Sequence, residues 1–493
     1  MRYLPDRTLM QKADERTIQD IGIPAIVLME RAALGCVAVM EDQNVDFSNT
    51  LIVCGSGNNG GDGFAIARLL AMKQIHPIIA FAGHLSSLSV ESRQQIYILQ
   101  KLGIPIESEI PDDDYTCVID ALFGVGLNRP IKGAYREHIQ KMNQMPGEKV
   151  AVDIPSGIDA STGQVLGCAF RAELTISMAF EKLGTVLDPG REYAGIVVPV
   201  EIGIPSQIFA GNEKICVAYE KEDLSSLLPA RAAASHKGTY GKVLMIVGSA
   251  GMCGAAYLSA KAAYAVGAGI IRIYTHEENR IVLQELLPEA IVSTYREYDE
   301  KQLKMLLDWS DTAAIGCGLG KSKCAEQMLG YLLKNYDKTC VIDADGINLL
   351  SEHMTWLKEA NAGIILTPHL KEMSRMTGQS VDAIAARRFE VLEQFVLDYP
   401  AVCVLKDART LVAKKKSRVY VNLSGCAAMA KAGSGDVLAG IITGLTAQKK
   451  DRLECACLGT FLHGLAGEMA AKELGMYSVL ASDQIDYLSR VLR

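Results

Sequence analysis

The spacing of apolar and polar residues predicts helices first and then a repeated alternation of strands and helices. Residues 7–20 and 24–40 carry apolar side chains at helical spacing and predict two amphipathic helices. After them, short apolar runs of strand length alternate with helical stretches of about ten residues. The strands predicted in the first half are 50–54, 76–82, 116–121, 149–153, 174–180 and 196–201. Such alternation predicts a parallel sheet covered by helices on both faces.

The alternation lapses around residues 204–222 and resumes at residue 242. The strands predicted beyond the lapse are 242–247, 270–274, 313–316, 339–343, 363–366, 401–406 and 418–422. Residues 434–493 are mostly helical in pattern, and 414–416 are typical of a solvated hairpin tip. Because 493 residues exceed the usual span of one hydrophobic core, we predict an α/β protein with two domains. They are residues 1–212 and 213–493, with the boundary near 210–218.

Composition indicates an ordinary globular protein without a nucleic-acid or membrane partner. Apolar residues make up 49% and charged residues 22% of the chain, and the net charge of −7 disfavours anionic partners. Thirteen cysteines are widely spread without a CxxC pair, which indicates neither a disulfide framework nor a zinc site. No signal peptide is evident, and no apolar run reaches the length of about 20 residues that spans a bilayer. We therefore expect a cytoplasmic protein, and we expect it to form a homo-oligomer.

Polar loops follow three predicted strands of the first half, at residues 58–62, 120–130 and 153–159. In a parallel sheet, ligands bind beyond the carboxyl ends of the strands. Each loop alone could be a simple cap, but three at one sheet edge predict a binding site. Backbone N–H groups of the paired glycines at 60–61 could hold a pyrophosphate. The pattern is not GxGxxG, and no acid ends the next strand, which disfavours an ordinary dinucleotide site.

Five polar stretches end strands or open helices in the second half: 316–320, 343–348, 367–369, 406–410 and 432–440. In the last, a glycine turn delivers Asp436 to the start of a helix, where unpaired N–H groups favour an anion. There Asp436 could accept the proton of a hydroxyl that attacks a phosphoryl group. The alternative is a helix cap with an acid in the first turn. Five such motifs together favour a nucleotide site, in which Lys406 would meet a phosphate.

The first set of motifs resembles the NAD(P)H-hydrate epimerase family over about residues 5–205. The matching stretches are LMERAA (28–33), NNGGDG (58–63), DALFGVGLNRP (120–130) and DIPSGID (153–159). The resemblance implies a Rossmann-like three-layer sheet that interconverts the R and S epimers at C6 of hydrated NADH or NADPH. The hydrate-binding residues that it implies are Asn58, Asn59, Gly60, Gly61, Asp62, Gly124, Val125, Gly126, Leu127, Asn128, Arg129, Pro130 and Asp153.

Two further roles in this half follow from the same resemblance. Asn59, Asp120 and Ser156 resemble the family's potassium ligands, and all three offer oxygen, which suits a hard cation. The C6 hydroxyl lies next to a ring nitrogen, so proton-assisted opening or departure would erase the stereochemistry. Asp153 is our candidate for the acid–base that moves this proton.

The second set of motifs resembles the ribokinase-like superfamily, and within it the NAD(P)H-hydrate dehydratase, over about residues 225–493. The matching stretches are HKGTYGKVLMIVGS (236–249), GCGLG (316–320), DADGINLL (343–350), TPH (367–369), KDART (406–410) and AGSGDVLAG (432–440). The resemblance implies a ribokinase-like three-layer sheet. The implied nucleotide-binding residues are Lys406, Asp407, Ala408, Arg409, Thr410 and Gly435, and the implied hydrate contacts are Ala255, Gly318, His369 and Asp436. Cys317 stands where a proline is usual, and TPHLKEM stands where TPHPGEM is usual.

The implied reaction uses a kinase-like step for elimination. A nucleotide, ADP or ATP, gives its terminal phosphoryl group to the C6 hydroxyl while Asp436 takes the proton. Phosphate then leaves and the dihydropyridine ring is restored, with Mg²⁺ bridging the phosphates. We expect ADP to be the nucleotide, and we expect the two domains together to repair both epimers of the hydrate.

Two alternatives stay open at this point. The second domain could be a kinase for a small alcohol, which would release a stable phosphorylated product. The first domain could be a non-catalytic binding module. Hydrate recovery with nucleotide separates repair from kinase activity, and clearance of the R epimer separates epimerase from binding module.

Overall fold

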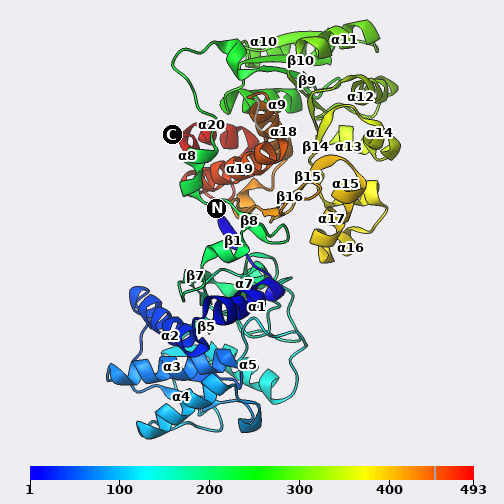
Figure 1. Cartoon of the computed structure of the whole chain (residues 1–493). Coiled ribbons are helices and arrows are strands. Elements are labelled where there is room, and N and C mark those ends of the chain that lie inside the picture. The colour runs from blue at the N-terminus through cyan, green and yellow to red at the C-terminus, as the bar shows by residue number, and fades with distance from the viewer. Residues whose placement is uncertain (449–450) are drawn as a thin grey trace. The chain divides into compact units, whose positions relative to one another are not determined.

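The computed structural model describes residues 1–448 and 451–493 and contains two compact units (Figure 1). The N-terminal unit is Tyr3–Cys216, and the C-terminal unit comprises Met1–Arg2 and Val217–Arg493. The division therefore lies four residues beyond the boundary expected between 212 and 213. Met1 and Arg2 belong to the C-terminal unit because their charges meet acids there: the guanidinium of Arg2 lies 2.9 Å from Glu220.

The N-terminal unit is built on six parallel strands in the order β3-β2-β4-β5-β6-β7. The strands are β2 (Thr50–Cys54), β3 (Ile78–Phe81), β4 (Cys117–Ala121), β5 (Glu148–Val152), β6 (Leu174–Met178) and β7 (Ile196–Val200). All six agree with the predicted strands to within two residues at each end. The chain order reverses between β2 and β4, and the carboxyl ends of strands flanking such a reversal form a crevice in which ligands bind.

Helices cover both faces of this sheet, as predicted. Ile52 packs in the same apolar cluster as Phe64 of α3, whereas Leu51 and Val53 pack with Ile139 of α5, because alternate side chains of a strand point to opposite faces. The helices are α1 (Arg7–Arg16), α2 (Ala25–Asp42), α3 (Asn58–Met72), α4 (Val90–Lys101), α5 (Ala134–Gln144), α6 (Leu183–Val186) and α7 (Gly190–Ala194), with a π-helical turn η1 (Thr17–Ile21) and 3₁₀ turns η2 (Leu85–Ser87) and η3 (Ser206–Phe209).

The second sheet has eleven strands in the order β1-β8-β17-β16-β15-β14-β13-β12-β9-β10-β11, and β9 to β17 lie entirely within the C-terminal unit. Its strands are β1 (Arg2–Leu4), β8 (Cys216–Ala218), β9 (Lys242–Ile246), β10 (Ile270–His276), β11 (Ile291–Tyr295), β12 (Thr312–Ile315), β13 (Thr339–Ile342), β14 (Gly363–Leu366), β15 (Ala401–Leu405), β16 (Leu411–Ala413) and β17 (Tyr420–Val421). From β9 to β15 every pairing is parallel, and the chain order reverses between β9 and β12. The predicted hairpin tip at 414–416 joins the antiparallel strands β16 and β17.

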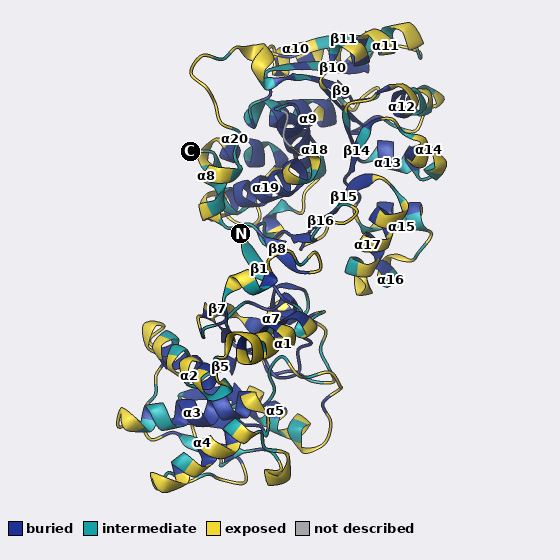
Figure 2. Ribbon diagram, viewed as in Figure 1, coloured by how far each residue is buried: buried dark blue, intermediate teal, exposed yellow. Residues whose placement is uncertain are grey.

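Helix α18 (Ser434–Thr446) is largely buried, and Figure 2 shows it in dark blue. It packs against α9 (Cys253–Ala265) at glycines, because a Cβ at Gly440 would lie 2.1 Å from the Ser259 carbonyl oxygen. The other helices are α8 (Leu224–Leu227), α10 (Arg280–Leu286), α11 (Glu300–Trp309), α12 (Lys323–Asn335), α13 (Asp345–Leu350), α14 (Met354–Glu359), α15 (Leu370–Thr377), α16 (Val381–Ala386), α17 (Arg388–Asp398), α19 (Arg452–Leu474) and α20 (Ala481–Val491), with 3₁₀ turns η4 (Lys221–Asp223), η5 (Lys237–Tyr240), η6 (Glu277–Asn279) and η7 (Ala427–Met429). Close packing against α9 therefore fixes α18 about one turn beyond Asp436. Across the part of the chain that the structure describes, every helix is too short or too polar to cross a membrane.

Candidate functional sites

A cavity of about 640 Å³ opens at the carboxyl ends of β2 and β4 in the N-terminal unit. Ten of the residues predicted to bind the hydrate line it: Asn58, Asn59, Asp62, Gly124, Val125, Gly126, Leu127, Asn128, Arg129 and Asp153. Three others, Gly60, Gly61 and Pro130, lie outside its lining. Gly60 lets two backbone segments pack closely, since a Cβ there would lie 1.9 Å from the Gly55 carbonyl oxygen. The strand-end loops thus converge as the sequence predicted.

Asp153 follows β5, and several hydrogen-bond donors of the protein surround its carboxylate. Its Oδ2 accepts from the Val125 amide (3.1 Å), and its Oδ1 accepts from the Met178 amide (3.3 Å) and from the ammonium of Lys182. The φ of Asp153 is 70°, a left-handed value that is strained for a residue with a side chain. Surrounding contacts therefore fix both the backbone and the carboxylate of this residue.

Lys182 is a functional candidate that the sequence interpretation missed. Its side chain is 0% exposed, and its ammonium also donates to the Ser177 hydroxyl (3.2 Å) and the Met178 carbonyl (2.8 Å). With the Asp153 contact, these partners use all three N–H donors of the ammonium. One feature of the sequence could have indicated it: Lys182 comes shortly after the apolar strand β6, and a lysine that is buried in such a place needs a charged or polar partner.

Two more carboxyl groups face this cavity, Asp14 on α1 and Asp62 on α3. Burial raises the pKa of Asp14 to about 7; the Lys182 ammonium opposes this rise, while the carboxylates of Asp153 and Glu15 add to it. Burial also raises the pKa of Asp62 well above its usual value, with Asp153 and Asp14 adding. Asp62 was among the predicted residues, and Asp14 was not. Both acids can therefore carry a proton at neutral pH.

The three predicted potassium ligands lie beside this cavity, around the ends of β4 and β5. Asp120 is fully buried and accepts from the Ser156 hydroxyl (2.7 Å) and the Ser156 amide (2.8 Å). Burial raises the pKa of Asp120 to about 6. Both polar atoms of the Asn59 side chain are buried without a hydrogen-bond partner among the described residues. A buried amide without a partner is costly, so this environment fits a bound cation.

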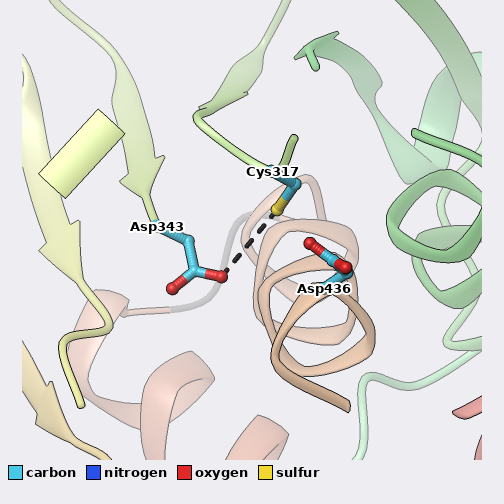
Figure 3. Close-up of side chains that lie close together, drawn as sticks. All are labelled: Cys317, Asp343 and Asp436. Carbon is cyan, nitrogen blue, oxygen red and sulfur yellow. Dashed lines mark hydrogen bonds between the residues drawn. The ribbon is translucent and has the colours of Figure 1, made fainter. Parts of the chain in front are cut away.

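In the C-terminal unit, Cys317, Asp343 and Asp436 point toward one another at the carboxyl ends of β12 and β13 and the start of α18 (Figure 3). One ligating atom from each lies within 4.8 Å of the others, a spacing that could hold a metal ion. The Cys317 thiol donates to Asp343 Oδ2 over 3.8 Å. Burial raises the pKa of Asp436 to about 6; the charge of Asp343 adds to this rise, and the nearby Cys317 thiol opposes it.

Lys406 joins this cluster from the end of β15. Its ammonium lies 2.7 Å from Asp343 Oδ1, which also accepts from the Thr367 hydroxyl at 2.7 Å. The ammonium would lie 3.5 Å from a Cβ at Gly435, and it is 4.0 Å from Glu372. The structure thus brings together Lys406, Gly435 and Asp436, three residues predicted for nucleotide and phosphoryl chemistry.

Two of the predicted hydrate contacts of this unit are neighbours, and a third, His369, lies beside Lys406. Gly318 packs closely against Ala255, since a Cβ at 318 would lie only 2.8 Å from the Ala255 Cβ. His369 is bridged to Lys406 by backbone pairing and caps α15, its Nδ1 accepting from the amides of Lys371 and Glu372. Burial lowers the pKa of His369, and the charge of Lys406 lowers it further. His369 is therefore neutral at physiological pH.

The rest of the predicted nucleotide segment, residues 407–410, is a turn whose side chains are internally engaged. Asp407 pairs with Arg388, which the sequence interpretation missed. Arg409 is 9% exposed and donates to the Leu423 carbonyl at 3.0 Å. The Thr410 hydroxyl donates to the Asp407 carbonyl at 3.1 Å, and Ala408 offers no polar side chain. Side-chain contacts with a nucleotide would therefore come first from Lys406.

Comparison with known proteins assigns both halves of the chain. The family model for NAD(P)H-hydrate dehydratase matches residues 243–490, and the model for the YjeF-related protein N-terminus matches residues 25–184. A bifunctional NAD(P)H-hydrate repair enzyme of Moorella thermoacetica is 34% identical over 100% of this chain and 97% of its own length. That of Escherichia coli is 32% identical over 97% of this chain and 92% of its own length. The chain belongs to the bifunctional NAD(P)H-hydrate repair enzymes.

Solved structures match the fold expected for the second half of the chain. A ribokinase-like superfamily protein from Enterococcus faecalis is 27% identical with a TM-score of 0.51, covering 56% of this chain and 95% of that protein. A hypothetical protein from Streptococcus mutans is 28% identical with a TM-score of 0.52, covering 56% of this chain and 98% of that protein. The predicted α/β class, the family and the ribokinase-like fold of the second half are thereby confirmed.

Proposed function

We propose that the two units of this repair enzyme act in turn on hydrated NADH or NADPH. The N-terminal unit interconverts the R and S epimers at C6, and the C-terminal unit returns the S epimer to NAD(P)H with a nucleotide co-substrate. The observation that carries the dehydratase assignment is the position of Asp436 at the start of α18, next to Lys406 and Gly435. Membership in a bifunctional family supports the pairing of the two activities.

Asp436 serves in this proposal as the base of the phosphoryl transfer. Its carboxylate takes the C6 hydroxyl proton as that oxygen attacks the terminal phosphorus and the bond to the nucleotide's bridging oxygen breaks. The unpaired amides at the start of α18 and the Lys406 ammonium receive the phosphoryl oxygens. The ring nitrogen then expels phosphate from C6, a C5 proton leaves, and the dihydropyridine is restored. Phosphorylation is useful here because phosphate is a better leaving group than hydroxide.

Cations and the nucleotide complete the proposal. The carboxylate oxygens of Asp343 and Asp436 suit Mg²⁺, which neutralises phosphate charge when it is bound. Asn59, Asp120 and Ser156 suit K⁺ in the N-terminal unit, and the unpartnered amide of Asn59 supports this. ADP is the proposed nucleotide, with ATP as the alternative. A homo-oligomeric state and a cytoplasmic location stay predictions from the sequence.

Hydrate recovery tests the proposed function. The chain is incubated with separated R or S hydrate, Mg²⁺, and either ADP or ATP, and reduced-nicotinamide absorbance and free phosphate are followed. We expect the S epimer to be recovered with equal release of phosphate. Failure with both nucleotides would contradict repair, and a stable phosphorylated product would favour a kinase. Clearance of the S epimer alone, after subtraction of spontaneous epimerisation, would favour a binding module in the N-terminal unit.

A further inference from the structure

We propose that Asp14 is the group that transfers the proton in the epimerase site, and that Asp153 is a fixed anion which Lys182 holds in place. The inference deepens the proposed epimerase function and rests on it. It also replaces the acid–base role that the sequence suggested for Asp153.

The contacts of Asp153 disfavour a role in proton transfer. Both carboxylate oxygens already accept from donors that the fold fixes, namely two backbone amides and the Lys182 ammonium. Hydrogen bonds to the charged form of a carboxyl group stabilise that form. Three of its roughly four acceptor positions are thus occupied, and protonation would weaken these bonds by neutralising the charge that they stabilise. Lys182 cannot easily follow a moving partner, because its other two N–H donors bind Ser177 and Met178.

Asp14 has the opposite environment on the same cavity. It lies in the last turn of the amphipathic helix α1, is half-buried, and lines the cavity with Asp62, Asp153 and Lys182. Within the described chain its carboxylate has neither a hydrogen-bond donor nor an ion-pair partner within contact distance, so both oxygens remain available to a ligand. The charged groups that act on it are Lys182, Asp153, Glu15 and Asp62. Its pKa of about 7 is close to the value at which general acid–base catalysis is most effective near neutral pH.

Asp62 is the other acid in the cavity and is a weaker candidate. It is 9% exposed, and burial together with the charges of Asp153 and Asp14 holds its pKa well above the usual value. A carboxyl group that stays protonated can donate a hydrogen bond but does not accept a proton. Asp62 would therefore orient the hydrate, while Asp14 exchanges a proton with it.

The proton balance of epimerisation requires one group that first accepts and then donates. Ionised Asp14 takes the C6 hydroxyl proton while the C6–N1 bond breaks and C6 becomes a carbonyl carbon. Protonated Asp14 then gives this proton to N1, whose electron pair came from the broken bond. Rotation about C5–C6 and the reverse sequence close the ring on the other face. No proton, electron or co-reactant is gained or lost over the cycle.

The test follows epimerisation alone, by chromatographic separation of the R and S hydrates in the absence of nucleotide, when the dehydratase unit is silent. The variants are Asp14→Asn, Asp14→Glu and Asp153→Asn, and the matched control is Glu15→Gln, an exposed acid on the same helix. Folding of each full-length variant is checked by its thermal unfolding, and its dehydration of the S epimer with nucleotide shows that the C-terminal unit is unaffected.

We expect the wild-type rate to rise with pH through about 7, because the ionised form of Asp14 starts the cycle. Asp14→Asn should slow epimerisation by about 10²-fold or more and remove this inflection. Asp14→Glu should restore part of the rate together with an inflection, and Asp153→Asn should keep the inflection even where the rate falls. Glu15→Gln should keep the wild-type rate above pH 7, with its inflection moved to a slightly lower pH because the charge of Glu15 adds to the pKa of Asp14.

Several results would overturn the inference. One is an unchanged rate and inflection in Asp14→Asn, and another is loss of the inflection in Asp153→Asn alone. If Asp14→Asn does not fold, an Asp14→Glu profile without a changed inflection would also overturn it. A wild-type chain that does not interconvert the epimers would instead contradict the proposed epimerase function, so the two failures are distinguishable.

Discussion

Each unit of the protein places a lysine–aspartate pair beyond the carboxyl ends of parallel strands, but the two lysines are used differently. Lys182 is fully buried, and its three donors are all bound within the protein. Lys406 keeps 18% of its side chain exposed, and among the described residues it donates one side-chain hydrogen bond, to Asp343. A lysine without a free donor positions its partner, whereas a lysine with free donors can also bind a phosphate.

A second acid accompanies each pair, and its burial suits the proposed chemistry of the site. Burial raises the pKa of Asp14 to about 7 and that of Asp436 to about 6. In the N-terminal unit the lysine is committed to the protein, so the site is suited to moving protons. In the C-terminal unit the lysine and the start of α18 remain available to an anion, so the same kind of pair is suited to phosphoryl transfer.

The largest predicted effect is on the rate of dehydration, when the proposed base Asp436 is removed from the C-terminal unit and the N-terminal unit is left intact. Asp436→Asn should slow dehydration of the S epimer by about 10²- to 10⁴-fold, because the hydroxyl would lose its proton acceptor. Interconversion of R and S hydrates, measured without nucleotide, should be unchanged. Dehydration at the wild-type rate would show that Asp436 is a helix cap and not a base.

The difference between the two lysines should also appear in stability. Lys182→Met leaves the buried charge of Asp153 unpaired and should destabilise the N-terminal unit by about 3–5 kcal/mol. Lys406→Met should cost less, since this lysine is 18% exposed and its site is more accessible to water, but it should raise the KM for the nucleotide. Urea unfolding and steady-state kinetics measure these effects.

The control for this pair of variants is Lys182→Met combined with Asp153→Asn, which removes the unpaired charge and should regain part of the lost stability. Equal destabilisation by the two lysine variants would contradict the distinction between a structural and a ligand-binding lysine.

Potassium should stabilise only the N-terminal unit, and more at pH 7.5 than at pH 5. The pKa of Asp120 is about 6 in the folded state, above the usual 3.8, so its ionisation costs stability as pH rises from about 4 to about 6. Bound K⁺ offsets this cost because it needs the ionised carboxylate. At about ten times its Kd, K⁺ adds about 1.4 kcal/mol. Thermal unfolding with K⁺ measures this, and Asn59→Leu should lose the response; an equal gain at both pH values would argue against Asp120 as a ligand.

The smallest predicted effect concerns the cysteine that stands where the family usually has proline. Cys317→Ala removes a thiol that lies close to Asp436 and holds the pKa of this carboxyl group down. The acidic limb of the S-epimer dehydration profile, which should lie near pH 6, should therefore move upward by less than about one pH unit. Cys324→Ala, a half-buried thiol elsewhere in the unit, is the control. A downward shift would mean that the thiol does not stabilise the ionised base.

Strands of the sheet centres were predictable because buried parallel strands are continuous apolar runs. β11 was missed because it is an edge strand with exposed positions such as Ile291, and β16 was missed because it has only three residues. The strand-end motifs were predictable because each is local in sequence. Lys182 and Asp14 were not, since a polar residue on an amphipathic helix or after a strand has the pattern of a solvent-facing one until the tertiary structure buries it.

The free thiols give each unit an intrinsic reporter of its own unfolding. Cys36, Cys54 and Cys117 are buried in the N-terminal unit, and Cys340 and Cys403 are buried in the C-terminal unit. A thiol inside a packed core reacts with an alkylating agent only when the core opens. Brief alkylation followed by peptide mass spectrometry would therefore record the opening of each unit separately, in a single sample and without any engineered label.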